Sequence, residues 1–250
     1  MVFVYLYAFI VGLIFGSFFN VVGLRVPKKQ SIVHPRSYCP KCGHSLTWYE
    51  LIPVVSFLIQ KGKCRNCHFP ISFIYPSIEF VTGLLFMFAL YKIGIHKELF
   101  LALTLISLLV IITVSDLCYQ LIPNRILLVF FVLFIFLRIW IPLSPWYDSI
   151  LGMVTGFILL YFIAVLSKGG MGGGDIKLFA VLGTVLGLKG ILLTFFLSSL
   201  IGAIFGVFGI ITKRLTRKSV IPFGPFISLG ALLAYFYETD IFNWYIHLLL

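Results

Sequence analysis

Charged residues are scarce in this chain, and acidic residues are the scarcest. Only 11% of the 250 residues are charged, and only 8 are Asp or Glu, whereas 61% are hydrophobic. Soluble globular chains are about 45–50% apolar. The composition therefore excludes an ordinary soluble domain and indicates a protein that crosses a membrane several times.

The first apolar run lacks the marks of a cleavable signal peptide. No basic segment precedes residues 2–22, and no small-residue cleavage site follows them. The run is also longer than the apolar core of a typical signal peptide. We therefore expect this run to be retained as a membrane span.

Apolar runs of spanning length recur along the whole chain. They lie near residues 2–24, 75–94, 99–115, 122–141, 150–167, 176–188, 190–212 and 223–237. The sixth run is short, and only Lys189 separates it from the seventh. The sequence predicts an all-α polytopic membrane protein with about eight transmembrane helices.

The net charge of +11 is explained by orientation in a membrane, so we expect no nucleic-acid partner. With both termini outside, fifteen of the 19 Lys and Arg residues fall on the cytoplasmic side. The opposite side keeps Lys92, Lys97, Arg138 and Lys189. This bias follows the positive-inside rule. We expect a multi-pass protein of the plasma membrane, with membrane lipids as partners.

The only long polar stretch, residues 25–72, carries two CxxC pairs. They are Cys39 with Cys42 and Cys64 with Cys67. This spacing is typical of a four-thiolate zinc site, and two disulfides are the alternative. A reducing cytoplasm disfavours disulfides. Four thiolates leave no open position for water, so the sequence predicts a structural zinc in a small cytoplasmic insert.

Two aspartates lie at the edges of apolar runs, where a carboxylate is costly and marks a functional site. Asp116 ends the third run, and Asp175 follows the glycine-rich segment 169–174. The structural alternatives are an interfacial acid for Asp116 and a helix N-cap for Asp175. The proposed topology brings both to the cytoplasmic face. Two close carboxylates share a proton and can activate water, while the glycines leave room for an extended peptide.

Helix polarity gives each aspartate an expected role. Asp175 precedes a helix, whose N-terminus favours the anion, and Asp116 follows one, whose C-terminus disfavours it. We expect Asp175 to be the base and Asp116 the proton donor.

Short motifs in one order along the chain carry a family resemblance. They are Gly16-Ser-Phe-Phe-Asn20 with Arg25 and Pro27, the four cysteines, Leu51-Ile-Pro53 with Ser56, Gly62-Lys-Cys64-Arg, Ile71-Ser72, Tyr75-Pro-Ser-Ile-Glu79 with Thr82-Gly83, Asp116 with Ile122-Pro123, and Gly170-Met-Gly172-Gly-Gly174-Asp175-Ile-Lys177. The chain resembles the type IV prepilin peptidases, bifunctional leader peptidases and N-methyltransferases of the GxGD aspartyl protease class. Where that family often carries a basic residue and an acid, this chain has Ile74 and Asn124.

The resemblance implies cleavage of prepilin or pseudopilin precursors after a glycine at the cytoplasmic face. It also implies N-methylation of the new terminus from S-adenosylmethionine. Such precursors serve pilus, secretion and competence systems. The residues it assigns are Asp116 and Asp175 for catalysis, Gly172, Gly173, Gly174 and Lys177 for the substrate loop, and Glu79, Asn20 and Arg25 for the methyl donor or substrate. No GxGxxG pattern follows an expected strand, so any cofactor pocket must be unconventional.

This assignment divides the chain into a first helix (1–24), a zinc-binding loop domain linked to methyl transfer (25–72) and an aspartyl peptidase core (73–250). Two other functions compete with it. An ion-coupled transporter would also use paired intramembrane acids, but it should show repeated broken helices, and this chain has one glycine-rich break and no internal repeat. The second competing function is a non-enzymatic assembly platform of a secretion system, in which the two aspartates would have no catalytic role.

Overall fold

The computed structural model describes residues 2–167, 171–213, 216, 219 and 221–249, and nearly all of its regular structure is helical. The chain divides into two compact units, residues up to Cys118 (the N-terminal unit) and residues from Tyr119 (the C-terminal unit). Within the described residues, the only β pairing is two isolated bridges in the insert, Tyr38 with Ser45 and Lys63 with Pro70.

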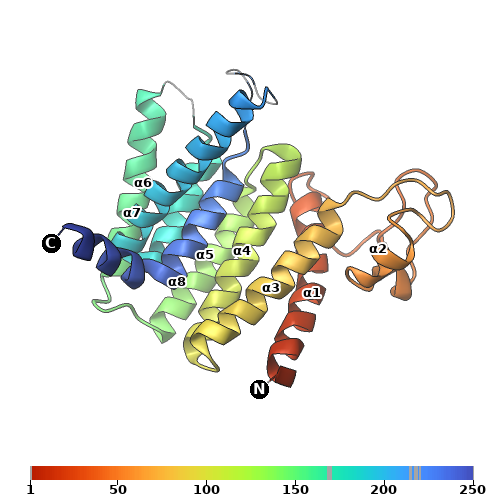
Figure 1. Ribbon diagram of the computed structural model, residues 1–250, viewed down its shortest axis with the longest axis horizontal. Helices are drawn as coiled ribbons and strands as arrows, with labels where there is room; N and C mark the ends of the chain where they lie inside the picture. The colour runs from red at the N-terminus through yellow and green to blue at the C-terminus, as the bar shows by residue number, and fades with distance from the viewer. Residues whose placement is uncertain (1, 168–170, 214–215, 217–218, 220, 250) are drawn as a thin grey trace. The chain divides into compact units, whose positions relative to one another are not determined.

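The N-terminal unit contains three long helices and the polar insert (Figure 1). The helices are α1 (Val2–Arg25), α3 (Ile74–Ile93) and α4 (Lys97–Tyr119). The insert joins α1 to α3 and carries the short helices η1 (Trp48–Leu51) and α2 (Val55–Ile59). These bounds match the first three predicted spans, except that α4 continues four residues past the predicted end.

Glycines allow the helices of the N-terminal unit to approach closely. A Cβ added to Gly12 would lie 2.7 Å from the Cα of Gly83, and one added to Gly16 would lie 2.8 Å from the Cα of Glu79. Gly23 packs in the same way against Val114 of α4. Small residues spaced four apart are the usual means of close helix packing in a membrane, where burial of apolar surface gives little driving force.

The C-terminal unit contains four helices. They are α5 (Asn124–Trp140), α6 (Asp148–Leu166), α7 (Gly173–Ile211) and α8 (Gly224–Leu249). Helix α7 packs against each of the other three. The backbones of α6 and α7 meet at Gly152 and Gly183, where an added Cβ would clash with the opposite carbonyl group.

Helix α7 is broken at Gly187, whose φ of 70° and ψ of −174° are not helical. The rings of Phe179 and Phe195 lie 6.4 Å apart across the break. In an unbroken helix, these sixteen residues would span about 24 Å. The halves 173–186 and 188–211 therefore fold back on each other as a hairpin. The two predicted runs form separate helical segments as expected, but the break is at Gly187 and not at Lys189.

Polar side chains satisfy the backbone groups that this break exposes. The N–H of Leu188 donates to Oδ1 of Asp148 at 3.3 Å, and Nη2 of Arg138 donates to the carbonyl oxygen of Val185. A helix end in an apolar surrounding needs such partners because unsatisfied backbone groups are costly there. The pair of side chains therefore stabilises the turn of the hairpin.

Five helices of the described chain, α1, α3, α4, α6 and α7, are long and apolar enough to cross a membrane. The 17-residue α5 and the apolar first part of α8 match two further predicted runs, and α7 covers another two. The expected all-α polytopic membrane protein with a small cysteine-rich insert is confirmed. Helix α8 continues twelve residues beyond the predicted end at residue 237.

Candidate functional site

The four insert cysteines form one cluster. Their sulfur atoms all lie within 4.8 Å of one another, with 3.7 Å between Cys39 and Cys67 and 3.9 Å between Cys42 and Cys64. A disulfide would require about 2.05 Å, so none joins these cysteines. A tetrahedral ion with four bonds of about 2.3 Å to sulfur has sulfur–sulfur edges of about 3.8 Å. The cluster therefore has the dimensions of a metal site.

The two halves of the cluster have the same local fold. The N–H groups of Gly43 and His68, each following the second cysteine of a pair, donate to the carbonyl oxygens of Cys39 and Cys64 at 2.9 Å. Both residues have positive φ, 70° and 55°. Each CxxC pair thus closes a tight knuckle, and the fold brings the two knuckles face to face.

The surroundings of the cluster shift the pKa values of its thiols in opposite directions. Backbone N–H groups, chiefly those of Cys42 for Cys39 and of His44 for Cys42, hold the pKa of these two thiols below its usual value. The N–H of Phe69 favours the Cys67 thiolate, but burial and the three neighbouring thiols raise the pKa of Cys67 to about 11. A metal ion would remove this conflict because it keeps all four ligands deprotonated.

Glu50 is a buried acid of the insert that sequence reasoning missed. Its Oε2 accepts hydrogen bonds from the backbone N of Thr47 at 2.9 Å, from Oγ1 of Thr47 at 2.7 Å, and from Nε2 of His44 at 3.1 Å. Burial by itself raises the pKa of Glu50, but these hydrogen bonds hold the pKa below its usual value. The Thr-x-x-Glu spacing is a capping box and was the available signal. Glu50 fixes the loop that follows the first knuckle.

Asn20 and Glu79 face the contact between α1 and α3. Asn20 is 1% exposed; its Nδ2 donates to the carbonyl oxygen of Tyr75 at 3.2 Å, and its Oδ1 has no hydrogen-bond partner among the described residues. Oε2 of Glu79, which is also buried, accepts the backbone N–H of Val54 at 2.8 Å. Arg25 makes a different contact, donating from Nη1 to the carbonyl oxygen of Ser31 at 3.1 Å.

The contact between Glu79 and Val54 ties the insert to a membrane helix. Val54 has φ of 62° and ψ of −49°, a conformation that a β-branched residue rarely adopts. Such strain persists where the surrounding structure holds it. The carboxylate of Glu79 is one group that does so, because it binds the N–H of this residue.

The two aspartates lie in different units. Asp116 is buried in the last turn of α4, which ends at Tyr119, so the expectation that it follows the helix is wrong. Asp175 is half-buried in the first turn of α7. The N-cap of α7 is Gly172, so the alternative of Asp175 as N-cap is wrong too. Both keep the expected helix polarity, and their pairing stays a prediction.

The predicted substrate loop is mostly the start of a helix. Gly173 and Gly174 are the first residues of α7, and Gly169 and Gly170 lie outside the described residues. A Cβ on Gly174 would lie 2.8 Å from Cβ of Ile122, whereas one on Gly173 would meet nothing within 4 Å. Gly173 is therefore the glycine of this turn with free space beside it.

Lys177 lies one turn into α7, close to the start of α5. Its Nζ donates to Oδ1 of Asn124 at 3.0 Å and so joins the starts of α7 and α5. In place of the acid that the family resemblance led us to expect, Asn124 supplies a neutral amide. The amide keeps the hydrogen bond but leaves the charge of Lys177 uncompensated by this partner.

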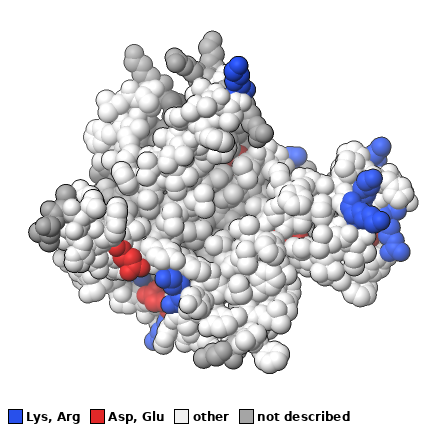
Figure 2. All heavy atoms as spheres, in the orientation of Figure 1, with Lys and Arg blue, Asp and Glu red and all other residues white. Residues whose placement is uncertain are grey.

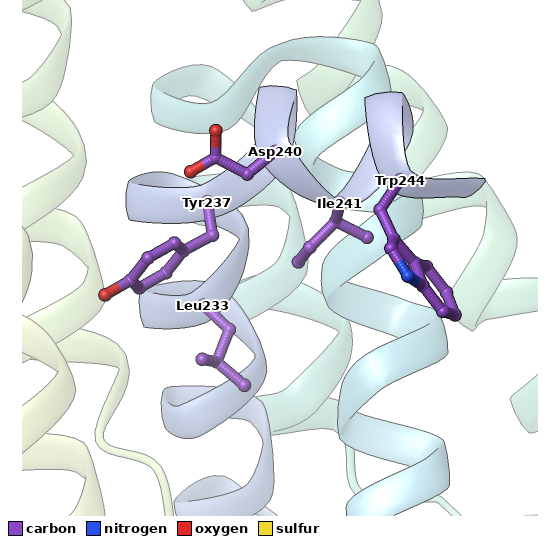
Figure 3. Close-up of a pocket in the computed structure, with 5 residues that line it drawn as sticks. All are labelled: Leu233, Tyr237, Asp240, Ile241 and Trp244. Atoms are coloured by element: carbon purple, nitrogen blue, oxygen red, sulfur yellow. The ribbon is translucent and has the colours of Figure 1, made fainter. Parts of the chain in front are cut away.

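A groove of about 510 Å³ on α8 is lined by Leu233, Tyr237, Asp240, Ile241 and Trp244 (Figure 3). None of the predicted site residues lines it. Its lining is mostly apolar and includes none of the proposed acid pair or the clustered thiols. We assign it no part in the chemistry.

These features define a polytopic helical membrane protein with four clustered cysteines that could hold a metal ion and with aspartates in the terminal turns of two apolar helices. Residues 10–93 match the bacterial peptidase A24 N-terminal domain, and residues 103–207 match the type IV leader peptidase family. The chain belongs to the type IV leader peptidase family.

Curated relatives agree along most of the chain. A prepilin leader peptidase/N-methyltransferase of Bacillus subtilis (strain 168) is 49% identical over 97% of this chain and 98% of its own length. Proteins of the same name from Myxococcus xanthus (strain DK1622) and Aeromonas salmonicida (strain A449) are 39% and 33% identical. These matches cover 80% and 97% of this chain, and 62% and 94% of the relatives. No solved structure matches the chain.

Proposed function

We propose that this protein is a membrane-embedded aspartyl endopeptidase that removes the basic leader of type IV prepilin-like precursors after a glycine. The observation that carries the proposal is the placement of Asp116 and Asp175, each in the terminal turn of an apolar helix. Carboxylates at such positions are costly and mark chemistry. Relatives named prepilin leader peptidase/N-methyltransferase support the substrate class.

The proposed reaction is hydrolysis by a carboxylate pair. Asp175 takes a proton from water, and the water oxygen attacks the carbonyl carbon of the scissile glycine. Asp116 protonates the carbonyl oxygen as the tetrahedral intermediate forms. The intermediate then collapses: one of its hydroxyl groups returns a proton to Asp116, the C–N bond breaks, and the leaving amine takes the proton held by Asp175. The helix N-terminus at Asp175 favours the anion, and the C-terminus at Asp116 favours the protonated acid.

The substrate loop supports this role through the turn at Gly172–Asp175. Gly173 is exposed and has open space beside its Cα, so an extended peptide can approach the backbone there. Lys177, tied to Asn124, fixes the direction of the helix that carries Asp175. The precursor's leader stays at the cytoplasmic face, where fifteen of the 19 Lys and Arg residues place the connecting loops.

The second proposed activity is methylation of the new N-terminus. S-adenosylmethionine would supply the methyl group: its S–CH3 bond breaks as the new N–C bond forms, S-adenosylhomocysteine leaves, and the amine loses a proton to water. Asn20 and Glu79 are the proposed binding residues because the buried Oδ1 of Asn20 is an acceptor without a partner in the described chain. A carboxylate such as that of Glu79 suits a sulfonium or ammonium group. Arg25 braces the adjoining loop.

The metal of the cysteine cluster is proposed to be a structural zinc ion. Cys39, Cys42, Cys64 and Cys67 fill a tetrahedral shell, and this leaves no position for substrate. The knuckles and the buried Glu50 supply the folded frame, since an insert this small has little apolar core of its own.

Purified protein reconstituted in vesicles with a precursor peptide tests the proposal directly. The peptide carries a lysine-containing leader, a glycine, and an apolar stem that begins with phenylalanine. Mass spectrometry should show cleavage after the glycine, and with S-adenosylmethionine the added mass of one methyl group. Asp240→Asn, at the α8 groove, is the control variant. An intact peptide with wild-type protein would contradict the peptidase and favour the transporter alternative.

A further inference from the structure

The segment from η1 to α2 has its apolar side chains on the outside. Residues 48–59 read WYELIPVVSFLI, with Glu50 as the only charged residue. Glu50 is buried, whereas Trp48, Leu58 and Ile59 are 78%, 67% and 76% exposed. None of the five residues of α2 is buried. This is the reverse of the arrangement in a water-soluble domain.

Two contacts fix this segment beside the end of a membrane span. The N–H of Val54, between η1 and α2, binds Glu79, which lies five residues, roughly 8 Å, along α3 from its first residue. The rings of Phe57 and Phe73 also meet at 5.9 Å, and Phe73 is the N-cap of α3. Figure 1 shows α2 to the side of α1, level with the C-terminal part of that helix.

The length of α3 sets the depth of these contacts. Its 20 residues extend about 30 Å, which equals the thickness of the hydrocarbon layer. The first residue of α3 therefore lies at the membrane boundary, and Glu79 lies below it. Val54, bonded to Glu79, must lie at the level of the lipid headgroups or slightly deeper.

The charges around the segment fit a lipid surface. Exposed basic residues follow α2 directly, namely Lys61, Lys63 and Arg65. Residues 25–72 contain eight Lys and Arg and one acid. Figure 2 shows Lys and Arg side chains gathered over the insert. Basic residues beside an exposed apolar face are typical of segments that lie in the interface of anionic membranes.

We propose that residues 48–59 form an interfacial membrane anchor that holds the zinc insert flat against the bilayer. Trp48, Val55, Leu58 and Ile59 enter the boundary between headgroups and acyl chains. Lys61, Lys63 and Arg65 contact anionic headgroups. The insert is then a membrane-bound module with a fixed orientation and does not tumble freely in water.

Depth-dependent fluorescence quenching tests this anchor in the full-length protein. The substitutions Trp140→Phe, Trp146→Phe and Trp244→Phe leave Trp48 as the only tryptophan. The protein is reconstituted in phosphatidylcholine–phosphatidylglycerol vesicles that contain lipids brominated on the acyl chain. Trp48 should show blue-shifted emission, lose fluorescence to the brominated lipid, and resist aqueous acrylamide.

A matched control places the probe elsewhere on the insert. In the same background without Trp140, Trp146 and Trp244, Ser45→Trp with Trp48→Phe puts the only tryptophan on the exposed edge of the first knuckle. Its fluorescence should be quenched by acrylamide and much less by brominated lipid. Leu58→Gln with Ile59→Gln should move Trp48 towards the behaviour of the control while the metal content stays at one ion per chain, which shows that the insert remains folded.

Two results would overturn the anchor. Equal acrylamide quenching of Trp48 and of the Ser45→Trp probe would place residues 48–59 in water. Shielding of Trp48 only after addition of a precursor peptide would assign the apolar face to the substrate's stem and not to lipid.

Discussion

The polar side chains of the two units bind backbone groups for different purposes. In the N-terminal unit, Glu79 binds the N–H of Val54 and so connects the insert to helix α3. Glu50 binds the N–H of Thr47 and fixes the loop that follows the first knuckle. In the C-terminal unit, Asp148 and Arg138 bind backbone groups at a helix break. In the N-terminal unit these side chains hold the insert in place. In the C-terminal unit they stabilise the turn between two helical segments.

The proposed methyl-transfer residues Asn20 and Glu79 both belong to the N-terminal unit, whereas the proposed acid pair needs Asp175 of the C-terminal unit. We therefore predict that the two proposed activities can be separated.

The largest expected effect is on cleavage. Asp116→Asn and Asp175→Asn should each lower the cleavage rate by roughly a hundred- to ten-thousand-fold, because each removes one acid–base group. Methylation of a peptide that already begins with phenylalanine should persist in both variants. Peptide mass spectrometry measures both products. Loss of methylation together with cleavage would show that the activities share one site.

The next effect concerns the metal. Cys64→Ser should lower the metal content from about one ion per chain to near zero, since three ligands do not complete a structural site. The insert should then become sensitive to limited proteolysis between α1 and α3, while the C-terminal unit stays resistant. Cys118→Ser, outside the cluster, is the matched control and should keep its metal. Full metal retention in Cys64→Ser would contradict the four-thiolate site.

Glycine substitutions should separate packing glycines from the open one. Gly12→Ala places a methyl group 2.7 Å from the Cα of Gly83, so it should destabilise the protein by about 1–3 kcal/mol. Gly173→Ala meets nothing within 4 Å and should leave the stability nearly unchanged. Thermal unfolding in detergent compares the two. An unchanged midpoint in Gly12→Ala would argue against the close contact of α1 and α3.

The smallest effect is expected at the hairpin turn. Asp148→Ala removes the acceptor for the N–H of Leu188 and should lower the free energy of unfolding by about 1–2 kcal/mol. Asp240→Asn, at the α8 groove, should have no such effect. The same thermal measurement serves both variants. Equal stability of Asp148→Ala and wild type would mean that Arg138 alone is sufficient to stabilise the turn.

The sequence predicted the parts of this protein that depend on local pattern. The apolar runs predicted the long helices, and the two CxxC pairs predicted the cysteine cluster. Gly187 was not identified as the break, because the neighbouring Gly183 and Gly190 look the same in the sequence and only Gly187 has positive φ. The hydrogen bond between the N–H of Val54 and Glu79 joins residues 25 positions apart, so no local sequence pattern could predict it. We expected Asp116 to follow the helix because we took the first charged residue after the apolar run as the end of that helix; α4 in fact continues to Tyr119.

The hairpin of α7 has a consequence for the membrane around it. Its first half, residues 173–186, extends only about 21 Å, whereas the hydrocarbon layer is about 30 Å thick. Counted from a turn at the outer surface, Asp175 lies only about 18 Å along this half and falls short of the opposite surface by about 12 Å. Either lipids thin locally or water enters to that depth. The rate of precursor cleavage should therefore depend on bilayer thickness. Lipids with longer acyl chains should slow cleavage, because water and the leader must then travel farther to reach Asp175.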